Sequence, residues 1–243
     1  MPLTKAKGNM YEFCTHTHSH LAGACPHACS YCYVQAMAKR FPNTAARWTG
    51  PVRLIPEEFR VKYGTGRTIF IEHMSDLFAE AIPGEFIRQV MAHCAEWPDN
   101  TYVFQTKNPA RLLTVLPMLP PFAILGITLE SDVWHVNAMG AAPKPAARAE
   151  AFAEICEKVR GIHQTFVTVE PILEFTDELQ RMLIDINPTW VNIGADSKGS
   201  GLTEPTAADV LDLIDDLVAC GIEVREKSNL KRLLPSRGGR KSP

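Results

Sequence analysis

Three cysteines lie close together near the amino end of the sequence, in the segment CPHACSYC. Cys25, Cys29 and Cys32 are separated by three and then two residues, so their thiolates can fold around one metal centre. A structural zinc site needs four closed ligands, usually supplied as two separated cysteine pairs. The sequence has no second pair, and three other cysteines fall on or near apolar stripes of helical spacing, as buried cysteines do: Cys94, Cys156 and Cys220. Zinc would therefore need a further ligand from a nearby set: Cys14, His16, His18, His20 or His27.

An iron–sulfur cluster is the alternative that the ligand count favours. A four-iron cluster normally takes four cysteines, so three thiolates leave one iron open to an added ligand. An open iron can chelate the amino and carboxylate groups of S-adenosylmethionine (AdoMet) and pass an electron to its sulfonium. Cleavage then yields a 5′-deoxyadenosyl radical, and the difficult chemistry resides in the cofactor. The sequence therefore predicts a [4Fe–4S] cluster on Cys25, Cys29 and Cys32, with AdoMet as the second cofactor.

The cysteine segment resembles the CxxxCxxC signature of the radical SAM superfamily, including the aromatic Tyr31 before the last cysteine. Further blocks resemble one phage and bacterial subfamily that is largely uncharacterised and distantly akin to spore photoproduct lyase; they are HMSDLFAEAIP, FQTKNPARL, GITLES, VEPIL and NIGADS. The resemblance covers roughly residues 13–200. The glycine-rich GGE block of the superfamily is absent, and His73-Met74-Ser75-Asp76 stands in its place.

The resemblance implies cofactor-binding roles for the residues at matching positions. Ser75 and Asp76 would approach the amino or carboxylate group of AdoMet. Thr128 and Glu130, at the end of a predicted strand, would lie near the ribose, where a carboxylate can accept both hydroxyls. Tyr31 would border the adenine.

Three polar residues at predicted strand ends are candidates for contact with the substrate: Gln105, Lys107 and Glu170. Lys107 could equally be a solvated loop lysine. Glu170 interrupts an apolar strand end, where a buried carboxylate without a partner would be costly, so a functional role is expected. Lys107 and Glu170 are the predicted catalytic residues, together with His18.

Three histidines alternate along the first predicted strand, at positions 16, 18 and 20. Period-two spacing places His16, His18 and His20 on one face. They either line the cavity below the cluster or are hydrogen-bonded core histidines, and their number favours the cavity. Cys14 shares their parity and is either a thiol near the radical or a buried bystander.

The elements that position these residues read as repeated βα units. Short apolar runs rich in β-branched and aromatic residues predict buried parallel strands at 13–18, 68–72, 101–105, 123–129, 165–169 and 190–194, with a possible last strand at 222–225. Helical stripes lie between them, the first over 30–40 and the last capped by Thr206 and closed near Gly221, while 141–147 is expected to be a loop. Six units are too few for a closed barrel, so we expect a single-domain partial (β/α)6 TIM barrel over residues 1–230, with its chemistry at the carboxyl ends of the strands.

Bulk properties exclude several classes of protein. Of the 243 residues 46% are hydrophobic, which is ample for one large core, and the seven cysteines are too few and too uneven for a disulfide framework. We see no signal peptide and no membrane span, so a cytoplasmic protein is expected. Net charge is −2, yet residues 231–243 carry five basic and no acidic side chains. That segment is either a solvated tail or a phosphate-binding arm.

The resemblance and the basic tail favour a substrate that is a nucleic-acid base or a nucleotide-linked group. A radical isomerase, aminomutase or lyase is expected, for example one that moves an amino group on a hypermodified thymidine of phage DNA, with a flavodoxin- or ferredoxin-type electron donor. The first alternative is radical modification of a peptide or small metabolite. The second is a non-catalytic zinc or redox-sensing module that binds nucleic acid.

Overall fold

The computed structural model describes residues 3–8, 10–197 and 199–234. Its centre is one eight-stranded sheet in the order β1-β2-β5-β6-β7-β8-β9-β10. The first two strands pair antiparallel, and every other pairing in this sheet is parallel. The strands are β1 Thr4–Lys5, β2 His16–His18, β5 Thr68–Ile71, β6 Thr101–Thr106, β7 Ala123–Thr128, β8 Gln164–Val169, β9 Trp190–Ile193 and β10 Glu223–Glu226.

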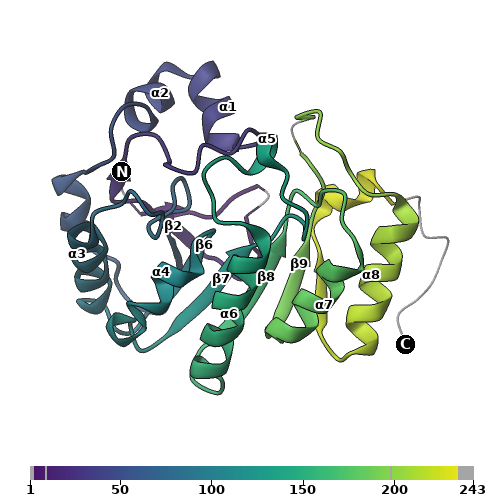
Figure 1. The fold of residues 1–243 in the computed structure, drawn as a ribbon. Helices are drawn as coiled ribbons and strands as arrows, with labels where there is room; N and C mark the ends of the chain where they lie inside the picture. Colours follow the sequence, from purple (N-terminus) through teal and green to yellow (C-terminus); the bar gives the residue numbers. More distant parts are fainter. Residues whose placement is uncertain (1–2, 9, 198, 235–243) are drawn as a thin grey trace.

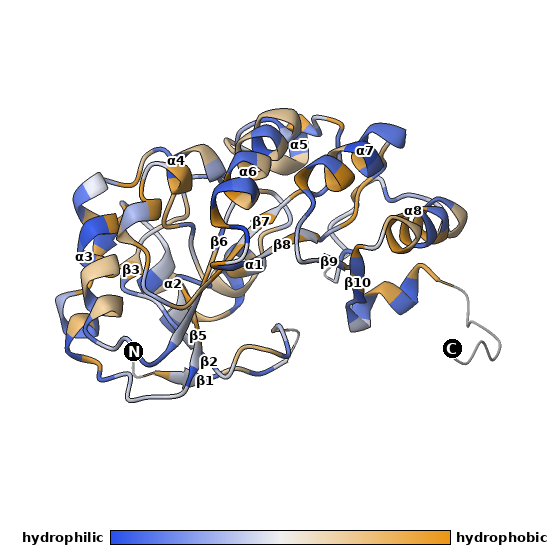
Figure 2. Ribbon diagram, turned by 90° about the horizontal axis from the view of Figure 1, so that it is seen from below, coloured by the Kyte–Doolittle hydropathy of each residue, from blue (hydrophilic) through white to orange (hydrophobic). Residues whose placement is uncertain are grey.

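A helix follows each parallel strand except β10. These helices are α1 Tyr33–Arg40, α3 Gly84–Ala95, α4 Pro109–Leu113, α6 Pro145–Val159, α7 Asp177–Ile186 and α8 Ala207–Ala219. Figures 1 and 2 show α3, α4, α6, α7 and α8 as an arc outside the curved sheet, while α1 lies above the strands. The two sheet edges, β1 and β10, do not pair with each other among the described residues. The predicted single α/β domain with an open partial barrel is thus confirmed.

Local sequence accounts for the bounds of the last helix. The side chain of Thr206 accepts a hydrogen bond from the backbone N–H of Asp209, and the Asp209 carboxylate accepts one from the Thr206 backbone, which is a complete capping box. The helix ends at Ala219, and Gly221 follows with a φ of 80°, a conformation that glycine adopts without steric cost. The predicted cap and terminus are therefore confirmed.

Two expectations about local structure were wrong, and one segment was not foreseen. The first strand is shorter than 13–18, because Tyr11 and Phe13 pack into an aromatic layer instead of continuing the sheet. Helix α6 already begins at Pro145, a residue tolerated in a first turn, so the loop expected over 141–147 ends there. The unforeseen segment is an insertion between the cysteine motif and β5. It contains α2 (Pro42–Trp48), β4 (Arg53–Leu54) and the 3-10 helix η1 (Pro56–Arg60). Strand β4 pairs with β3 (Leu21–Ala22), which precedes the cysteine motif.

Two apolar layers hold the barrel together. The larger one lies between the sheet and the outer helices, whose hydrophobic faces turn toward the strands in Figure 2. The smaller one fills the inside of the barrel and contains Tyr11, Phe70, Phe166 and Trp190. The rings of Phe166 and Trp190 stack with centroids 5.4 Å apart and an interplanar angle of 6°. This aromatic layer forms the floor beneath the polar end of the barrel.

The carboxyl-terminal segment lies only partly within the described residues. Lys231 and Arg232 belong to the 3-10 helix η3 (Ser228–Arg232), and Arg232 forms an ion pair with Glu204. The remaining basic residues of the predicted tail, Arg237, Arg240 and Lys241, lie outside the described residues, so the tail stays a prediction. Within the described chain, none of the helices has the length and apolarity to cross a membrane.

The aromatic floor depends on a glycine in β7. A Cβ added at Gly126 would lie 2.2 Å from the Phe166 ring. We predict that Gly126→Ala lowers the free energy of unfolding by about 3 kcal/mol, measured by urea denaturation, because the ring cannot move without breaking its stack. The control is Gly84→Ala, whose added Cβ would lie 3.6 Å from its nearest atom. The free energy of unfolding of this control should stay within about 0.5 kcal/mol of that of the original protein. Equal stability of the two variants would contradict this packing.

Candidate active site

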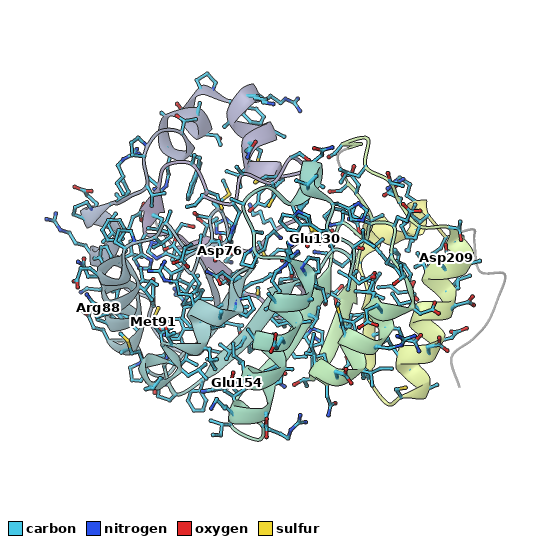
Figure 3. The ribbon with its side chains drawn as sticks, viewed as in Figure 1. Asp76, Arg88, Met91, Glu130, Glu154 and Asp209 are labelled. Carbon is cyan, nitrogen blue, oxygen red and sulfur yellow. The ribbon has the colours of Figure 1, made fainter. Side chains whose placement is uncertain are left out.

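A cavity of about 600 Å³ opens at the carboxyl ends of the parallel strands. Its wall includes all three cysteines of the predicted cluster motif, with side chains from β1, α1 and the ends of β5, β6, β7 and β8. Figure 3 shows the labelled Asp76 and Glu130 at this end of the sheet, well away from Glu154 on the outer helix α6. The cavity therefore lies where parallel-stranded barrels place their chemistry.

The cysteine loop is held by backbone contacts on two sides. The backbone N–H of Cys32 donates to the carbonyl of Cys29 at 3.2 Å, immediately before α1 begins. The backbone N–H of Ala141 donates to the carbonyl of His27 at 2.7 Å, beside the short helix α5 (Val136–Met139). A Cβ at Gly140 would lie 2.0 Å from that same carbonyl, so only glycine allows the two segments to approach. The loop is thus fixed before any ligand binds.

The donor set of this loop fits an iron–sulfur cluster. Cys25, Cys29 and Cys32 are free thiols on one cavity wall, and burial raises the pKa of Cys25 to about 12, so metal binding must displace its proton. A structural zinc site needs four closed ligands, whereas a four-iron cluster held by three thiolates keeps one iron open to a further ligand. The three thiols on the wall of a cavity therefore suit a cluster better than a single structural ion.

Asp76 anchors the cysteine loop to the sheet. Its carboxylate accepts hydrogen bonds from His27 Nε2 at 2.8 Å, Thr106 Oγ1 at 2.8 Å, and the backbone N–H groups of Lys107 at 2.7 Å and Phe78 at 2.9 Å. Burial would raise the pKa of Asp76, but the hydrogen bonds, led by that from His27, hold it below its ordinary value. These contacts give Asp76 a positioning role. The expected approach of Asp76 and Ser75 to AdoMet stays a prediction, with both residues on the cavity wall.

Glu130 is fully buried behind the cavity wall and is surrounded by cations. Its carboxylate lies 2.7 Å from Arg148 Nη1 and 3.1 Å from Lys107 Nζ, and it accepts a hydrogen bond from the Tyr31 hydroxyl. Burial alone would raise the pKa of Glu130, but Arg148 and then Lys107 outweigh burial and lower the pKa below the ordinary value of 4.5. The arrangement orients Tyr31 and Lys107, which both face the cavity.

A chain of polar side chains crosses the barrel between the cavity and the aromatic floor. The Tyr11 hydroxyl donates to Gln105 Oε1 at 2.8 Å and lies 2.6 Å from Thr168 Oγ1. Gln105 Nε2 in turn donates to Thr128 Oγ1 at 2.9 Å. Thr128 and Gln105 therefore line the cavity as expected, but each already has a protein partner.

Glu170 forms a second charged group on the cavity wall. Its carboxylate lies 2.7 Å from Lys227 Nζ and accepts a hydrogen bond from Asn229 Nδ2 at 2.6 Å. The Lys227 ammonium also lies 4.7 Å from the centre of the Tyr11 ring. The carboxylate expected to be buried is half-buried, and it has a partner.

The structure brings most of the predicted site residues together around one cavity: Cys25, Cys29, Cys32, Tyr31, Ser75, Asp76, Lys107, Thr128 and Glu170. Glu130 reaches this cavity through Tyr31 and Lys107. His18 does not belong to the group, because its ring is buried on another side of β2 and contacts Tyr63 and Glu58.

Sequence reasoning missed three residues that shape the site, Tyr11, Arg148 and Lys227, and it named His27 only as a candidate zinc ligand. Lys227 directly follows β10, two residues beyond the end of the predicted last strand, so the rule that singled out polar residues at strand ends could have found it. Arg148 begins the apolar stripe of α6 that continues in Phe152, and an arginine in such a stripe signals a buried partner. Tyr11 lies in an irregular segment whose pattern carries no such signal.

Most of the sequence matches the model of one protein family. The model of the family described as "Protein of unknown function (DUF5131)" matches residues 9–223, so the chain belongs to that family. None of the curated proteins matches the chain. The phage association expected from the sequence stays a prediction.

Solved structures share the fold at low identity. A spore photoproduct lyase mutant with bound AdoMet and dinucleoside spore photoproduct has a TM-score of 0.58 and 10% identity, over 92% of this chain and 80% of that chain. SuiB from Streptococcus suis bound to S-adenosylmethionine has a TM-score of 0.54 and 10% identity, over 92% of this chain and 53% of SuiB. The chain therefore has the partial-barrel fold of radical SAM enzymes, and the likeness shows the fold alone.

The charges around Glu130 give a pH-dependent stability. Because its folded-state pKa is lowered, ionised Glu130 stabilises the fold above pH 4.5, and this contribution is lost as the pH falls below that value. At neutral pH we predict that Glu130→Gln lowers the free energy of unfolding by about 3–5 kcal/mol, because Arg148 stays buried without its counter-charge. Urea denaturation at several pH values should show a smaller acid loss for this variant than for the original protein.

The matched control for this measurement is Glu154→Gln, since Glu154 forms only an exposed pair with Lys158 at 3.4 Å. It should leave both stability and its pH dependence nearly unchanged. An acid loss in Glu130→Gln as large as that of the original protein would contradict the assigned role of Glu130.

Proposed function

We propose that this protein is a radical SAM enzyme whose [4Fe–4S] cluster is held by Cys25, Cys29 and Cys32. The observation that carries the proposal is the position of three free thiols of the CxxxCxxC motif on the wall of one cavity in a radical SAM-like fold. When bound, the cluster and AdoMet supply an electron transfer and a 5′-deoxyadenosyl radical. External electrons would come from a flavodoxin- or ferredoxin-type donor.

The residues of the chain have separate tasks in this proposal. Asp76 and His27 fix the cysteine loop at the end of β6. Tyr31, oriented by Glu130, presents its ring to the cavity as a wall for the adenine, and Ser75 faces the same space. Lys107 remains available as a cation at the cavity wall, with 15% of its side chain exposed. Glu170 is the proposed contact for the substrate, since it lines the cavity and its ion pair with Lys227 fixes its position there.

The proposed substrate is a nucleic-acid base or a group attached to one. Two exposed lysines of the amino-terminal segment, Lys5 and Lys7, contribute to the cavity wall, where they can contact a phosphodiester. The solved spore photoproduct lyase holds a dinucleoside in a barrel of the same fold. We propose a rearrangement, such as migration of an amino group on a modified thymidine, because an isomerisation balances without a second redox centre.

A peptide substrate is the second candidate. SuiB bound to its precursor peptide SuiA shares the fold with a TM-score of 0.53, although this chain covers only 48% of SuiB. The lysines of the amino-terminal segment favour the nucleic-acid substrate, and the two candidates differ in the experiments below.

Removal of one cluster ligand tests the proposed chemistry. After anaerobic reconstitution with iron and sulfide, we expect Cys29→Ala to lose reductive formation of 5′-deoxyadenosine, measured by liquid chromatography with dithionite as reductant. Cys220→Ala is the control, because Cys220 is exposed beyond α8 and should leave that activity unchanged. Continued production by Cys29→Ala would show that the cluster is assigned wrongly.

The substrate proposal predicts a salt-dependent contact with DNA. In Lys5→Gln/Lys7→Gln, the slope of log affinity against log salt for a DNA oligonucleotide should fall by about one for each lysine, since each contributes one phosphate contact. The control is Lys158→Gln, whose lysine lies exposed on the outer helix α6. DNA binding that is unaffected by the double substitution would contradict the proposal, and turnover of a peptide alone would favour the second candidate.

A further inference from the structure

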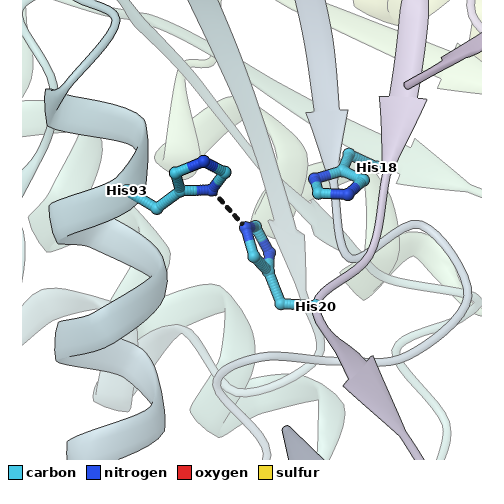
Figure 4. A group of neighbouring side chains, drawn as sticks. All are labelled: His18, His20 and His93. Carbon is cyan, nitrogen blue, oxygen red and sulfur yellow. Dashed lines mark hydrogen bonds between the residues drawn. The ribbon is translucent and has the colours of Figure 1, made fainter. Parts of the chain in front are cut away.

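A buried group of three histidines lies apart from the cavity, between β2 and α3. His18 is on β2, His20 follows that strand, and His93 is on α3 (Figure 4). All three are at most 2% exposed, and one ring nitrogen from each lies within 4.8 Å of the others. The Tyr63 hydroxyl lies among them, 2.7 Å from His18 Nδ1 and 3.1 Å from His20 Nε2.

The outward nitrogen of each ring faces an acceptor. His18 Nε2 lies 3.0 Å from a Glu58 carboxylate oxygen, and His20 Nδ1 lies 2.8 Å from one of Glu72. His93 Nε2 lies 3.0 Å from the backbone carbonyl of Val61, which can only accept. These partners therefore assign the ring proton of each histidine to its outward nitrogen.

The inward side of the group then has too few protons. With the outward nitrogens protonated, the three inward nitrogens are bare lone pairs, and the Tyr63 hydroxyl can donate to only one of them. His20 Nε2 and His93 Nδ1 nevertheless lie 2.8 Å apart, which is a repulsive contact unless a cation is shared between them. The geometry requires either an additional proton or a metal ion.

A metal ion accounts for more of this geometry than an additional proton does. A proton would join only His20 Nε2 and His93 Nδ1, whereas one nitrogen from each of the three rings and the Tyr63 hydroxyl lie close together. Neutral imidazole is the form of the histidine ring that binds metals.

We propose that His18, His20 and His93, with the Tyr63 hydroxyl as fourth ligand, form a second metal site that takes a divalent transition ion, best matched by zinc. Three imidazole nitrogens and one oxygen suit tetrahedral zinc. At bond lengths of about 2.1 Å, ligand atoms are about 3.3 Å apart, so the His20 and His93 rings would separate by about half an ångström. Glu58, Glu72 and the Val61 carbonyl are the outer partners that orient metal-binding imidazoles.

The surrounding carboxylates attract a cation. The Glu58 and Glu72 carboxylates are both buried at 2% exposure, and Arg47 forms an ion pair with Glu58 at 2.5 Å. Negative charge this close to the three rings favours a positive ion between them.

The site would be structural, because its ligands are closed off from solvent and leave no open position. It would join the end of β2 and helix α3 to the insertion that contains Tyr63. Glu72 contributes to the wall of the main cavity while its carboxylate holds His20, so the two sites share one residue. The site does not depend on the proposed radical chemistry.

Metal analysis of the full-length protein tests the inference. After incubation with zinc and desalting, elemental analysis should find about one zinc per chain besides the irons of the cluster. Cys29→Ala should lose iron and keep zinc, whereas His93→Gln should lose zinc and keep iron. The control His16→Gln, on the same strand, should keep both, since the His16 ring instead contacts Thr15.

A second measurement does not need a histidine variant that folds. Cobalt(II) added to metal-depleted Cys25→Ala/Cys29→Ala/Cys32→Ala, which lacks the thiols of the cluster motif, should give the visible bands of a four-coordinate ion, and zinc should raise the Tm of this variant by about 10 °C. Less than about 0.2 zinc per chain in the original protein, zinc retained in His93→Gln, or the absence of four-coordinate cobalt bands in the cysteine variant would each overturn the proposed site. None of these outcomes would affect 5′-deoxyadenosine formation, so failure here is distinct from failure of the proposed function.

Discussion

The hydrogen bond between His27 and Asp76 is the contact on which the geometry of the candidate active site depends. His27 lies between the first two cysteines of the motif, so the hydrogen bond of its ring to Asp76 fixes the position of the whole loop. The Asp76 carboxylate also accepts hydrogen bonds from the Thr106 hydroxyl and the Lys107 backbone N–H at the end of β6. A carboxylate with four donors is satisfied even when buried, and it can therefore act as a fixed point in an apolar setting. The sheet thus sets the position of the loop before any metal centre binds.

Acidic side chains at the other strand ends act in the same manner. Glu130 is held by Arg148 and Lys107, and Glu170 by Lys227 and Asn229. Each of these carboxylates joins segments that are far apart in the sequence, and each leaves a neighbouring group facing the cavity. The strand ends therefore form a charged framework in which acidic residues position others. In the proposed function, direct contact with AdoMet and the substrate falls to Tyr31, Ser75, Glu170 and the lysines.

Much of this arrangement could be predicted from the sequence, because the signals are local. The cysteine spacing, the apolar runs and the cap at Thr206 each act over a few residues, and the structure contains the corresponding loop, strands and helix end. The role of His18 could not be predicted in this way. Parity places it correctly on a face of β2, but only the packing of α3 and of the insertion, distant in sequence, makes that face the interior of a histidine cluster. The pairing of Glu170 with Lys227 likewise depends on β10 lying beside β9.

The aromatic layer that Gly126 permits determines from which end of the barrel ligands can reach the cavity. Phe166 and Trp190 are essentially inaccessible, at 0% and 1% exposure, so solvent does not reach the cavity through the lower half of the barrel. Molecules must therefore reach the cavity from the opposite end of the barrel, where the cysteine loop forms part of the wall. A small ligand at the depth of Thr128 would be covered by a larger one bound above it, so the small ligand would have to bind first and leave last.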